Sequence, residues 1–252
     1  MSKSIAIIAG AGPGTGSAVA RRFAQFYPVV LLARSQVSLD PLVTDITNNG
    51  GSALGIPTDV TSASSMSSTI DQIKSKFGSD LTIAAAIYNV ASKFVMKPFL
   101  DQAPEEFFAS LEPSNRGAFN FAQATLPLML NGDKGKYPPT LIFTEGDGEL
   151  MVEGATASLK GGSGLSSFAM SKFGTRALSQ SLAREFGPKG VHVSHAIIDG
   201  IIDTEKTKGY GQDIPDAKID PQGIADSYWF LHTQPKSAFT QEIDLRPYVE
   251  KW

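Results

Sequence analysis

The sequence lacks cysteine, and it also lacks long runs of charge or of apolar residues. None of its 252 residues is Cys, and the formal net charge is −3. Disulfides and thiolate-ligated metal sites are therefore excluded, and no other metal-ligand spacing occurs. The absence of a basic run argues against nucleic acid as a partner. The apolar run at residues 4–9 is too short for a signal segment or a membrane span, so we expect a soluble, cytoplasmic protein.

Short β-branched runs alternate with longer amphipathic stretches, which indicates strand–helix–strand units and a parallel sheet. The expected strands are Ser4–Ala9, Val29–Ala33, Ala53–Pro57, Leu81–Asn89, Thr140–Thr144 and Val191–Ile198. The clearest helices are Ser64–Phe77, Gly117–Leu130 and Leu165–Phe186, and a first helix should carry Val19, Phe23 and Phe26 on one face. No linker or repeat divides the chain. We predict one α/β domain over residues 1–252, a Rossmann-type doubly wound parallel sheet with helices on both faces.

A glycine-rich turn follows the first expected strand and opens the first expected helix. Its residues 9–16 read Ala-Gly-Ala-Gly-Pro-Gly-Thr-Gly, with the candidate cofactor contacts Gly10, Gly12, Gly14, Thr15 and Gly16. Gly10 permits the tight turn, Gly14 permits close approach to a pyrophosphate, and Gly16 permits helix–strand packing. The free N–H groups of the helix N-terminus then face the phosphates. The alternative is a purely structural turn, but the flanking strand and helix favour a dinucleotide site.

The end of the second expected strand distinguishes the two nicotinamide cofactors. A carboxylate that would bind the ribose hydroxyls of NAD is absent there, and Arg34 stands in its place. A guanidinium matches a 2′-phosphate in charge and geometry, although a solvated surface Arg is the alternative. We therefore predict NADP(H). Asp59 and Val60, after the third expected strand, suit the adenine, or Asp59 caps the following helix.

Two polar loops flank the expected strand Thr140–Thr144. Residues 131–139 precede it and residues 145–154 follow it. Ligands of parallel sheets bind beyond the carboxyl ends of the strands. The second loop is therefore expected at the mouth of the site, and the first at the opposite edge.

Taken together, these residues resemble the short-chain dehydrogenase/reductase family over nearly the whole chain. The resemblance rests on the glycine turn, Asp59-Val60, residues 88–91 (Tyr-Asn-Val-Ala), the run around Lys172, and Asp199-Gly200 followed by Thr204. It is similar to a fungal and bacterial branch in residues 154–159 (Gly-Ala-Thr-Ala-Ser-Leu) and 245–252.

The resemblance implies a role for several further residues. It gives Asn89 to the cofactor ribose wall, Ile201, Ile202 and Thr204 to the carboxamide and pyrophosphate, and Lys172 to the nicotinamide ribose. It also implies a small-molecule substrate and a homodimer or homotetramer packed through the helices Gly117–Leu130 and Leu165–Phe186.

The departures from the family pattern concern the catalytic positions. Phe168 stands where the family's Tyr precedes the Lys by four residues, and Ala155 stands where its Ser is expected. Ser114 takes the place of its helix-borne Asn. Of the usual catalytic set only Lys172 remains, and Phe168 provides no general acid. Because Phe168 and Lys172 are four residues apart on one helix, both should face the same pocket.

Three functions stay open on these residues. The first is hydride transfer to a substrate that needs no proton from Tyr, such as an iminium ion, or transfer assisted by another acid. The second is non-redox isomerisation, dehydration or cyclisation with NADP retained. The third is a non-catalytic NADP-binding protein. NADPH consumption separates the first from the other two, and product formation separates the second from the third.

Other side chains are candidates for the missing chemistry. The guanidinium of Arg116, beside the family's Asn position, is able to polarise a carbonyl, and an ordinary helix-surface Arg is the equal alternative. Tyr88 and Tyr210 are possible replacement phenols, although packing roles are commoner. Residues 207–218, with two glycines around Tyr210, are predicted to form a lid. His192 and His195 are interpreted as structural.

The loop 145–154 carries Glu145, Asp147, Glu149 and Glu153. Carboxylates at the mouth favour a cationic substrate, more strongly in a desolvated cleft, while a solvated loop is the alternative. Hydride addition to an iminium carbon gives a neutral amine, so no alkoxide needs a proton. The sequence thus favours reduction of a cationic C=N group, in an alkaloid by the resemblance to fungal secondary-metabolism members that join iminium reduction to cyclisation.

Overall fold

The computed structural model describes residues 4–91, 93–131, 135–145, 156–211 and 213–250, which build one seven-stranded sheet. All strand pairs are parallel, in the order β3-β2-β1-β4-β5-β6-β7. The strands are β1 (Ser4–Ala9), β2 (Val29–Ala33), β3 (Ala53–Pro57), β4 (Thr82–Tyr88), β5 (Thr140–Glu145), β6 (His192–Ile198) and β7 (Glu242–Leu245). The predicted doubly wound fold is confirmed.

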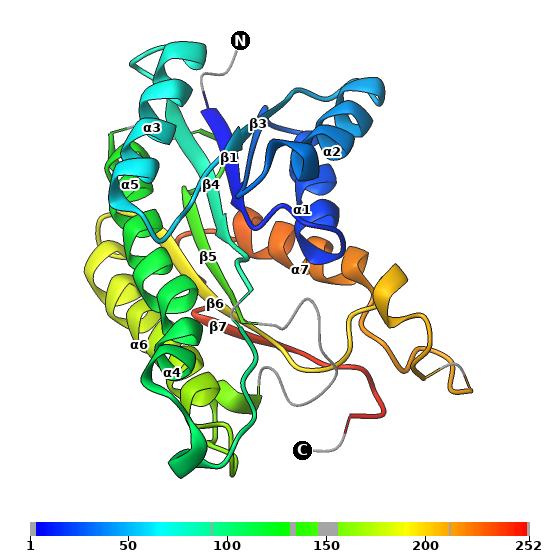
Figure 1. Cartoon of the computed structure of the whole chain (residues 1–252). Helices are drawn as coiled ribbons and strands as arrows, with labels where there is room; N and C mark the ends of the chain where they lie inside the picture. Colours follow the sequence, from blue (N-terminus) through cyan, green and yellow to red (C-terminus); the bar gives the residue numbers. More distant parts are fainter. Residues whose placement is uncertain (1–3, 92, 132–134, 146–155, 212, 251–252) are drawn as a thin grey trace.

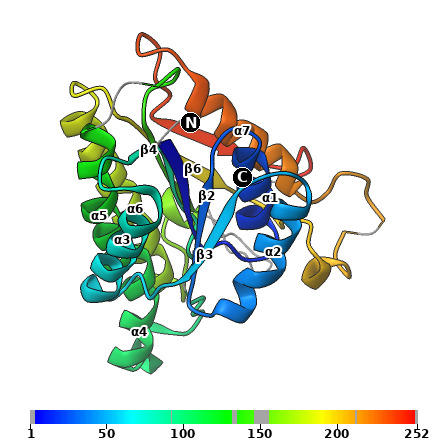
Figure 2. The same cartoon turned by 90° about the horizontal axis from the view of Figure 1, so that it is seen from above.

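Helices cover both faces of the sheet (Figures 1 and 2). One layer contains α3 (Ala63–Phe77), α5 (Ala118–Leu130) and α6 (Ser166–Phe186), and the other contains α1 (Thr15–Ala24), α2 (Gln36–Asn48) and α7 (Pro221–Thr233). The short helix α4 (Pro104–Leu111) packs on α6 and continues through a π-helical stretch, Glu112–Gly117, into α5. Single 3₁₀ turns occur at Phe99–Asp101, Thr156–Ser158 and Glu205–Thr207.

Alternating strand residues build two separate cores. Ile5 and Ile7 of β1 face α3 and α5, whereas Ala6 and Ile8 face α1 and α7. Because a strand inside a parallel sheet is buried on both faces, β1 is apolar nearly throughout, which made it recognisable in the sequence. This double burial fixes the register of β1 and thereby the place of the glycine turn that follows it.

Three features differ from the sequence expectations. The first helix ends at Ala24, so Phe26 is not on its buried face: 54% of Phe26 is exposed, and its ring stacks on Trp229 at 4.0 Å. The edge strand β7 was missed because its sequence, Glu-Ile-Asp-Leu, is short and half charged. The helices α2 and α7 were also not singled out, and α2 carries an internal proline, Pro41, that breaks a helical pattern.

No described helix is long and apolar enough to cross a membrane. Among the described residues, no three His, Asp or Glu side chains are grouped closely enough to hold a metal ion.

A chain of polar contacts joins Tyr27, which follows α1, to α7 and β5. The Tyr27 hydroxyl lies 2.9 Å from His232 Nε2, and His232 Nδ1 lies 3.0 Å from the Thr140 hydroxyl, which itself donates to the Pro138 carbonyl. Because the Thr140 hydroxyl donates its proton to the Pro138 carbonyl, it must accept a hydrogen bond from His232 Nδ1. His232 Nε2 is then unprotonated and accepts from the Tyr27 hydroxyl. Burial, followed by the neighbouring His192, lowers the pKa of His232 to about 4. The ring is therefore held neutral.

This burial predicts a pH-dependent stability. A histidine whose pKa is lowered on folding contributes stability above its ordinary pKa of about 6.5 and loses it as the pH falls towards 4. Between pH 7 and 4.5 we expect the free energy of unfolding of the wild type to fall about 2 kcal/mol more than that of His232→Gln. Urea unfolding at both pH values measures this difference. Parallel pH dependences of the two proteins would contradict it.

Candidate cofactor and active site

A cleft lies where β1, β4, β5 and β6 end, at the point where the strand order reverses between β1 and β4. Ligands of open parallel sheets bind at this place. The lining residues come from the segment that follows each strand or from its last positions: Pro13, Gly14, Thr15, Asn89, Ala91, Thr144, Ile202 and Thr204. Five of them were predicted from the sequence, and Pro13, Ala91 and Thr144 were not.

The glycine turn is packed too closely for side chains at two positions. A Cβ at Gly10, where φ is +82°, would lie 2.1 Å from the Asn89 carbonyl oxygen, and one at Gly16 would lie 2.2 Å from the Gly10 carbonyl oxygen. Asn89 adds a side-chain bond, its Nδ2 donating to the Gly10 carbonyl at 3.1 Å. Nothing lies within 4 Å of a Cβ at Gly12, so packing does not require glycine there. The turn is thus tied to the end of β4, and the α1 N-terminus points into the cleft.

The start of α1 offers hydrogen-bond donors to a ligand. Its N-cap is Gly14, with no side-chain cap, whereas Ser62 caps α3 and Asp220 caps α7. The Thr15 hydroxyl is buried and has no partner in the described structure, although Thr15 lines the cleft. Free N–H groups and a hydroxyl beside a positive helix end form an anion site. These residues fit the diphosphate of a dinucleotide.

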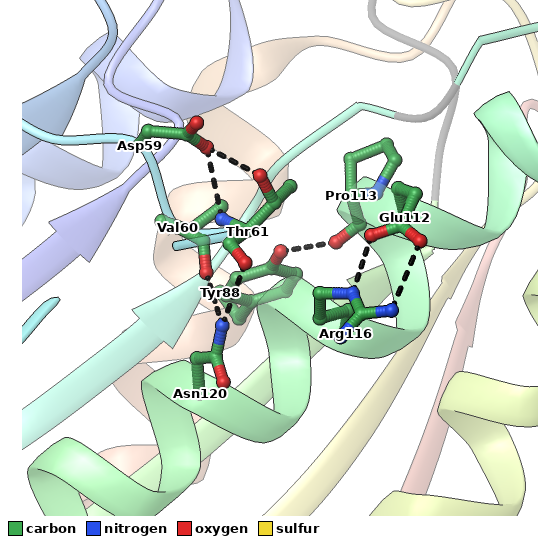
Figure 3. Close-up of polar contacts among 8 residues, drawn as sticks. All are labelled: Asp59, Val60, Thr61, Tyr88, Glu112, Pro113, Arg116 and Asn120. Carbon is green, nitrogen blue, oxygen red and sulfur yellow. Dashed lines mark hydrogen bonds and ion pairs between the residues drawn. The ribbon is translucent and has the colours of Figure 1, made fainter. Parts of the chain in front are cut away.

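The segment after β3 is held by its own side chains and by α5 (Figure 3). Asp59 is exposed and accepts bonds from the Thr61 N–H at 2.9 Å and the Thr61 hydroxyl at 2.7 Å. It does not cap α3, because Ser62 does. Asn120 of α5 holds the segment from below, donating to the carbonyls of Val60 and Thr61 at 2.9 and 3.1 Å.

Lys172 and Phe168 face the same interior, as predicted. The Phe168 ring is fully buried and meets Phe94 edge-on, with ring centroids 5.1 Å apart. The Lys172 Nζ lies 5.0 Å from the centre of the Phe168 ring. Lys172 is only 3% exposed, and its ammonium makes no hydrogen bond or ion pair within the described residues. A buried cation with unused donors fits the hydroxyls of a ribose.

The π-helical stretch places Ser114 and its neighbours. Ser114 is buried, and its carbonyl accepts a bond from the Thr175 hydroxyl of α6 at 3.1 Å. Asn115 Nδ2 donates to the Ser171 carbonyl at 2.9 Å, and it sits where a Cβ on Gly174 would be 2.4 Å away. Ser114 and Asn115 therefore fasten this stretch to the turn of α6 that carries Lys172.

Arg116 and Tyr88 do not replace the missing acid in this geometry. Arg116 is exposed, and its guanidinium donates to both carboxylate oxygens of Glu112 on the same stretch of helix (Figure 3). The Nε bond is 2.5 Å long and the Nη2 bond is 3.2 Å long. It lies outside the cleft lining, in the surface role that was the alternative in the sequence. The Tyr88 hydroxyl donates to the Pro113 carbonyl, and burial, followed by the charge of Asp59, raises its pKa. The Tyr88 proton is therefore used in this hydrogen bond, and the raised pKa makes the hydroxyl a poor proton donor to a substrate.

The predicted acidic loop lies mostly outside the described residues. Asp147, Glu149, Glu153 and the Ala155 position belong to that undescribed part, and the structure describes Glu145 only as the last residue of β5. These positions stay predictions.

The segment after β6 leaves the sheet as a long loop whose two ends, near Ile202 and Ile219, are held together. Ile202 and Ile219 form a parallel bridge, and Lys218 pairs with Asp203. Thr204 faces the glycine turn, since a Cβ on Gly14 would lie 3.0 Å from its methyl group. Of the predicted carboxamide and pyrophosphate contacts, Ile202 and Thr204 therefore line the cleft and Ile201 stands beside them. The predicted lid, 207–218, lies within this segment, except for residue 212, which is outside the described residues.

The sequence profile described as short chain dehydrogenase matches residues 4–215. This chain belongs to the short-chain dehydrogenase family. An uncharacterized oxidoreductase of Staphylococcus aureus is 26% identical over 249 residues, with 98% of each chain covered.

Solved structures of the family share the fold. A short-chain dehydrogenase from Rhodopseudomonas palustris is 30% identical, has a TM-score of 0.77 and aligns over 98% of this chain and 100% of its own. A metagenomic short-chain oxidoreductase in complex with NADP is 22% identical, with a TM-score of 0.77 and 99% of each chain covered. As a short-chain dehydrogenase, this chain is an oxidoreductase of that type, and its glycine turn, Thr15 and Lys172 fit a nicotinamide dinucleotide.

The unpaired hydroxyl of Thr15 gives a direct test of the cofactor site. Thr15→Val keeps the shape and removes a donor that has no described protein partner, so thermal stability should not change. Loss of one hydroxyl donor to a charged phosphate should weaken nicotinamide cofactor binding by about tenfold, or ~1.4 kcal/mol. The matched control is Thr125→Val, because the buried Thr125 hydroxyl donates to the Phe121 carbonyl at 2.8 Å inside α5. It should cost stability and leave the affinity intact. Wild-type affinity in Thr15→Val would exclude the phosphate role.

Proposed function

We propose that this short-chain dehydrogenase is an NADP(H)-dependent reductase of cationic C=N groups in small molecules. Phe168 carries the proposal: an apolar ring fills the helix position, four residues before Lys172, from which the family pattern expects a phenol. The cofactor supplies a hydride when it is bound, and the chain must supply everything else. The proposal follows from which groups the chain retains and which it has lost.

The choice of NADP(H) rests on Arg34. It follows β2 directly, is exposed, and makes no hydrogen bond or ion pair within the described residues. A carboxylate, which would bind the ribose hydroxyls of NAD, is absent from the end of β2. A free guanidinium at this corner suits a 2′-phosphate in charge and geometry. The metagenomic relative in complex with NADP, and an alcohol dehydrogenase from Thermococcus sibiricus complexed with 5-hydroxy-NADP, are compatible with this choice.

The choice of C=N over C=O rests on proton balance. Reduction of a carbonyl places negative charge on oxygen, and a positioned acid that neutralises it contributes about 10²–10⁴ in rate. Phe168 has no proton to give, and the proton of Tyr88 is held by the Pro113 carbonyl. Reduction of an iminium ion yields a neutral amine and needs no proton at that moment. The chain's apolar wall is adequate for this second reaction.

The aromatic surroundings also favour a substrate with delocalised positive charge. The Phe168 and Phe94 rings meet edge-on, and ring faces attract cations. Lys172, whose Nζ lies 5.0 Å from the centre of the Phe168 ring, opposes this attraction by its own charge. The acidic loop 145–154 adds carboxylates to the same balance as a sequence-based hypothesis. The alkaloid substrates and the coupled cyclisation suggested by resemblance belong to this proposal.

Replacement of Arg34 tests the cofactor. Arg34→Ala should weaken NADPH binding by about 1.5–3 kcal/mol, the range of a hydrogen bond to a charged group, and leave NADH binding nearly unchanged. Titration of cofactor fluorescence measures both. The matched control is Arg21→Ala, which removes a surface guanidinium paired with Asp45 on the same side of the sheet. Equal losses for NADPH and NADH would show that Arg34 does not bind the phosphate.

Paired substrates test the reaction. With a cyclic iminium ion and the ketone of the same ring size, wild type should oxidise NADPH at least about 100-fold faster with the iminium, the smaller end of the range for a missing general acid. Phe168→Tyr should change the iminium rate by less than about threefold, since that reaction does not use the phenol.

Other outcomes would point to other functions. A wild-type rate with the ketone as high as with the iminium would end the proposal in favour of a carbonyl reductase with another acid. Conversion of substrate without NADPH oxidation would indicate an isomerase, dehydratase or cyclase. Cofactor binding without any conversion would indicate an NADP-binding protein.

A further inference from the structure

Asp199 is a buried carboxylate at the cofactor end of the sheet, and the cofactor site described above makes no use of it. It follows the last residue of β6 and is 1% exposed. Its backbone N–H donates to the Leu245 carbonyl of β7 at 3.0 Å. A carboxylate at such a place is costly unless charges and hydrogen bonds compensate it. Its partners therefore indicate what the chain gains by keeping it.

Three chain segments meet at this carboxylate. Arg246, just after β7, forms an ion pair with Asp199 and also holds Asp244 through two bonds of 2.7 and 2.9 Å. The Arg246 pKa is raised mainly by its bond to Asp244, with the charge of Asp199 adding to it. The Thr156 hydroxyl donates to the same Asp199 carboxylate from the third segment. Thr156 and Arg246 thus meet at the same oxygen of Asp199, Oδ2.

The partner segment that matters most is the turn Thr156–Ser158. It begins one residue after position 155, where the family pattern expects a catalytic Ser. Its other end is also held, because Arg176 of α6 donates to the Ser158 carbonyl at 3.3 Å and binds Glu242 of β7 at 2.7 and 2.8 Å. Ala157, in the middle of this turn, packs in the same cluster as Phe168. Asp199 therefore holds the backbone that supports the Phe168 wall.

The same carboxylate also fixes the segment that leads to the cleft. Gly200, the next residue, has φ +149°, and a Cβ there would lie 2.6 Å from Cδ of Pro247. Pro247, after β7, thus packs closely against Gly200. Gly200 begins the segment that carries Ile202 and Thr204, and both of these residues line the cleft. The Asp199–Arg246 pair clamps these two segments together.

We propose that Asp199 and Thr156 are positioning residues for the substrate side of this site: their bond, backed by the Asp199–Arg246 pair, sets the turn 156–158 against Phe168 and the segment from Gly200. This inference rests on the proposed function for its kinetic consequence but not for its structural one. Supporting residues of this kind control the placement of the reacting groups, and a displacement near 1 Å costs about 10²-fold in rate. Neither residue lines the cofactor cleft.

The test uses variants that keep side-chain shape. Thr156→Val removes the hydroxyl, Thr156→Ser retains it without the methyl group, and Asp199→Asn removes the charge. The control is Asp45→Asn in α2, which breaks an exposed ion pair between Asp45 and Arg21 of α1. Each protein is compared with wild type by NADPH affinity, emission of bound NADPH, amide hydrogen exchange of residues 156–160, and kcat and KM for the cyclic iminium.

For Thr156→Val we expect NADPH affinity within about twofold of wild type, kcat lower by about tenfold, exchange at 156–160 faster by about tenfold, and a shifted NADPH emission. Thr156→Ser should restore all four quantities to within about twofold, and Asp199→Asn should exceed Thr156→Val because it also weakens the ion pair with Arg246. Asp45→Asn should match wild type.

Specific results overturn the proposal. It fails if Thr156→Val keeps wild-type exchange and emission, or if Thr156→Ser behaves like Thr156→Val, or if NADPH affinity falls as much as kcat. Exchange and emission require only the protein and NADPH. Absence of iminium reduction in wild type would therefore refute the proposed function alone, while these two measurements still decide the role of Asp199 and Thr156.

Discussion

The contact of two backbones at the switch point of the sheet determines the rest of the site. Gly10, at the end of β1, lies so close to the Asn89 carbonyl that no side chain fits between them. This contact forces β1 and β4 to end at the same level, and it turns the chain so that α1 starts beneath the cleft. Thr15, the uncapped N–H groups and Asn89 then converge directly beyond the ends of β1 and β4. The sheet itself therefore places this half of the site.

The substrate half is built in another way. In the proposed function its wall is Phe168 with Phe94, and the surrounding turn is held by ion pairs and hydrogen bonds between segments far apart in the chain. Loss of a phenol removes a proton donor, but it also removes a polar group that would otherwise need a partner in a desolvated place. Lys172 Nζ lies 5.0 Å from the centre of the Phe168 ring. In the proposed function, one half holds the cofactor and the other selects the substrate.

The sequence predicted the cofactor half far better than the substrate half, for physical reasons. Strands buried on both faces are apolar throughout, and the glycine turn follows directly from one of them, so local pattern was sufficient. Arg116 was a candidate only because of its place in the chain, and its direction depends on the helix geometry around it. Asp199 entered the sequence analysis only as part of the Asp199-Gly200 pair, since its partners Thr156 and Arg246 are distant in sequence. Contacts of this kind leave no periodic pattern to read.

The π-helical stretch Glu112–Gly117 has a consequence for how this helix can vary. Successive residues of a helix are rotated by about 100°, and a π turn inserts an extra residue into the winding. Loss of one residue here would rotate α5 relative to α4. It would swing Asn120 away from the Val60 and Thr61 carbonyls, and it would replace Gly117 beneath the Tyr88 hydroxyl, where a Cβ would lie only 2.2 Å from that oxygen. The stretch is therefore a spacer of fixed length, open to substitution on its exposed side but closed to insertion and deletion.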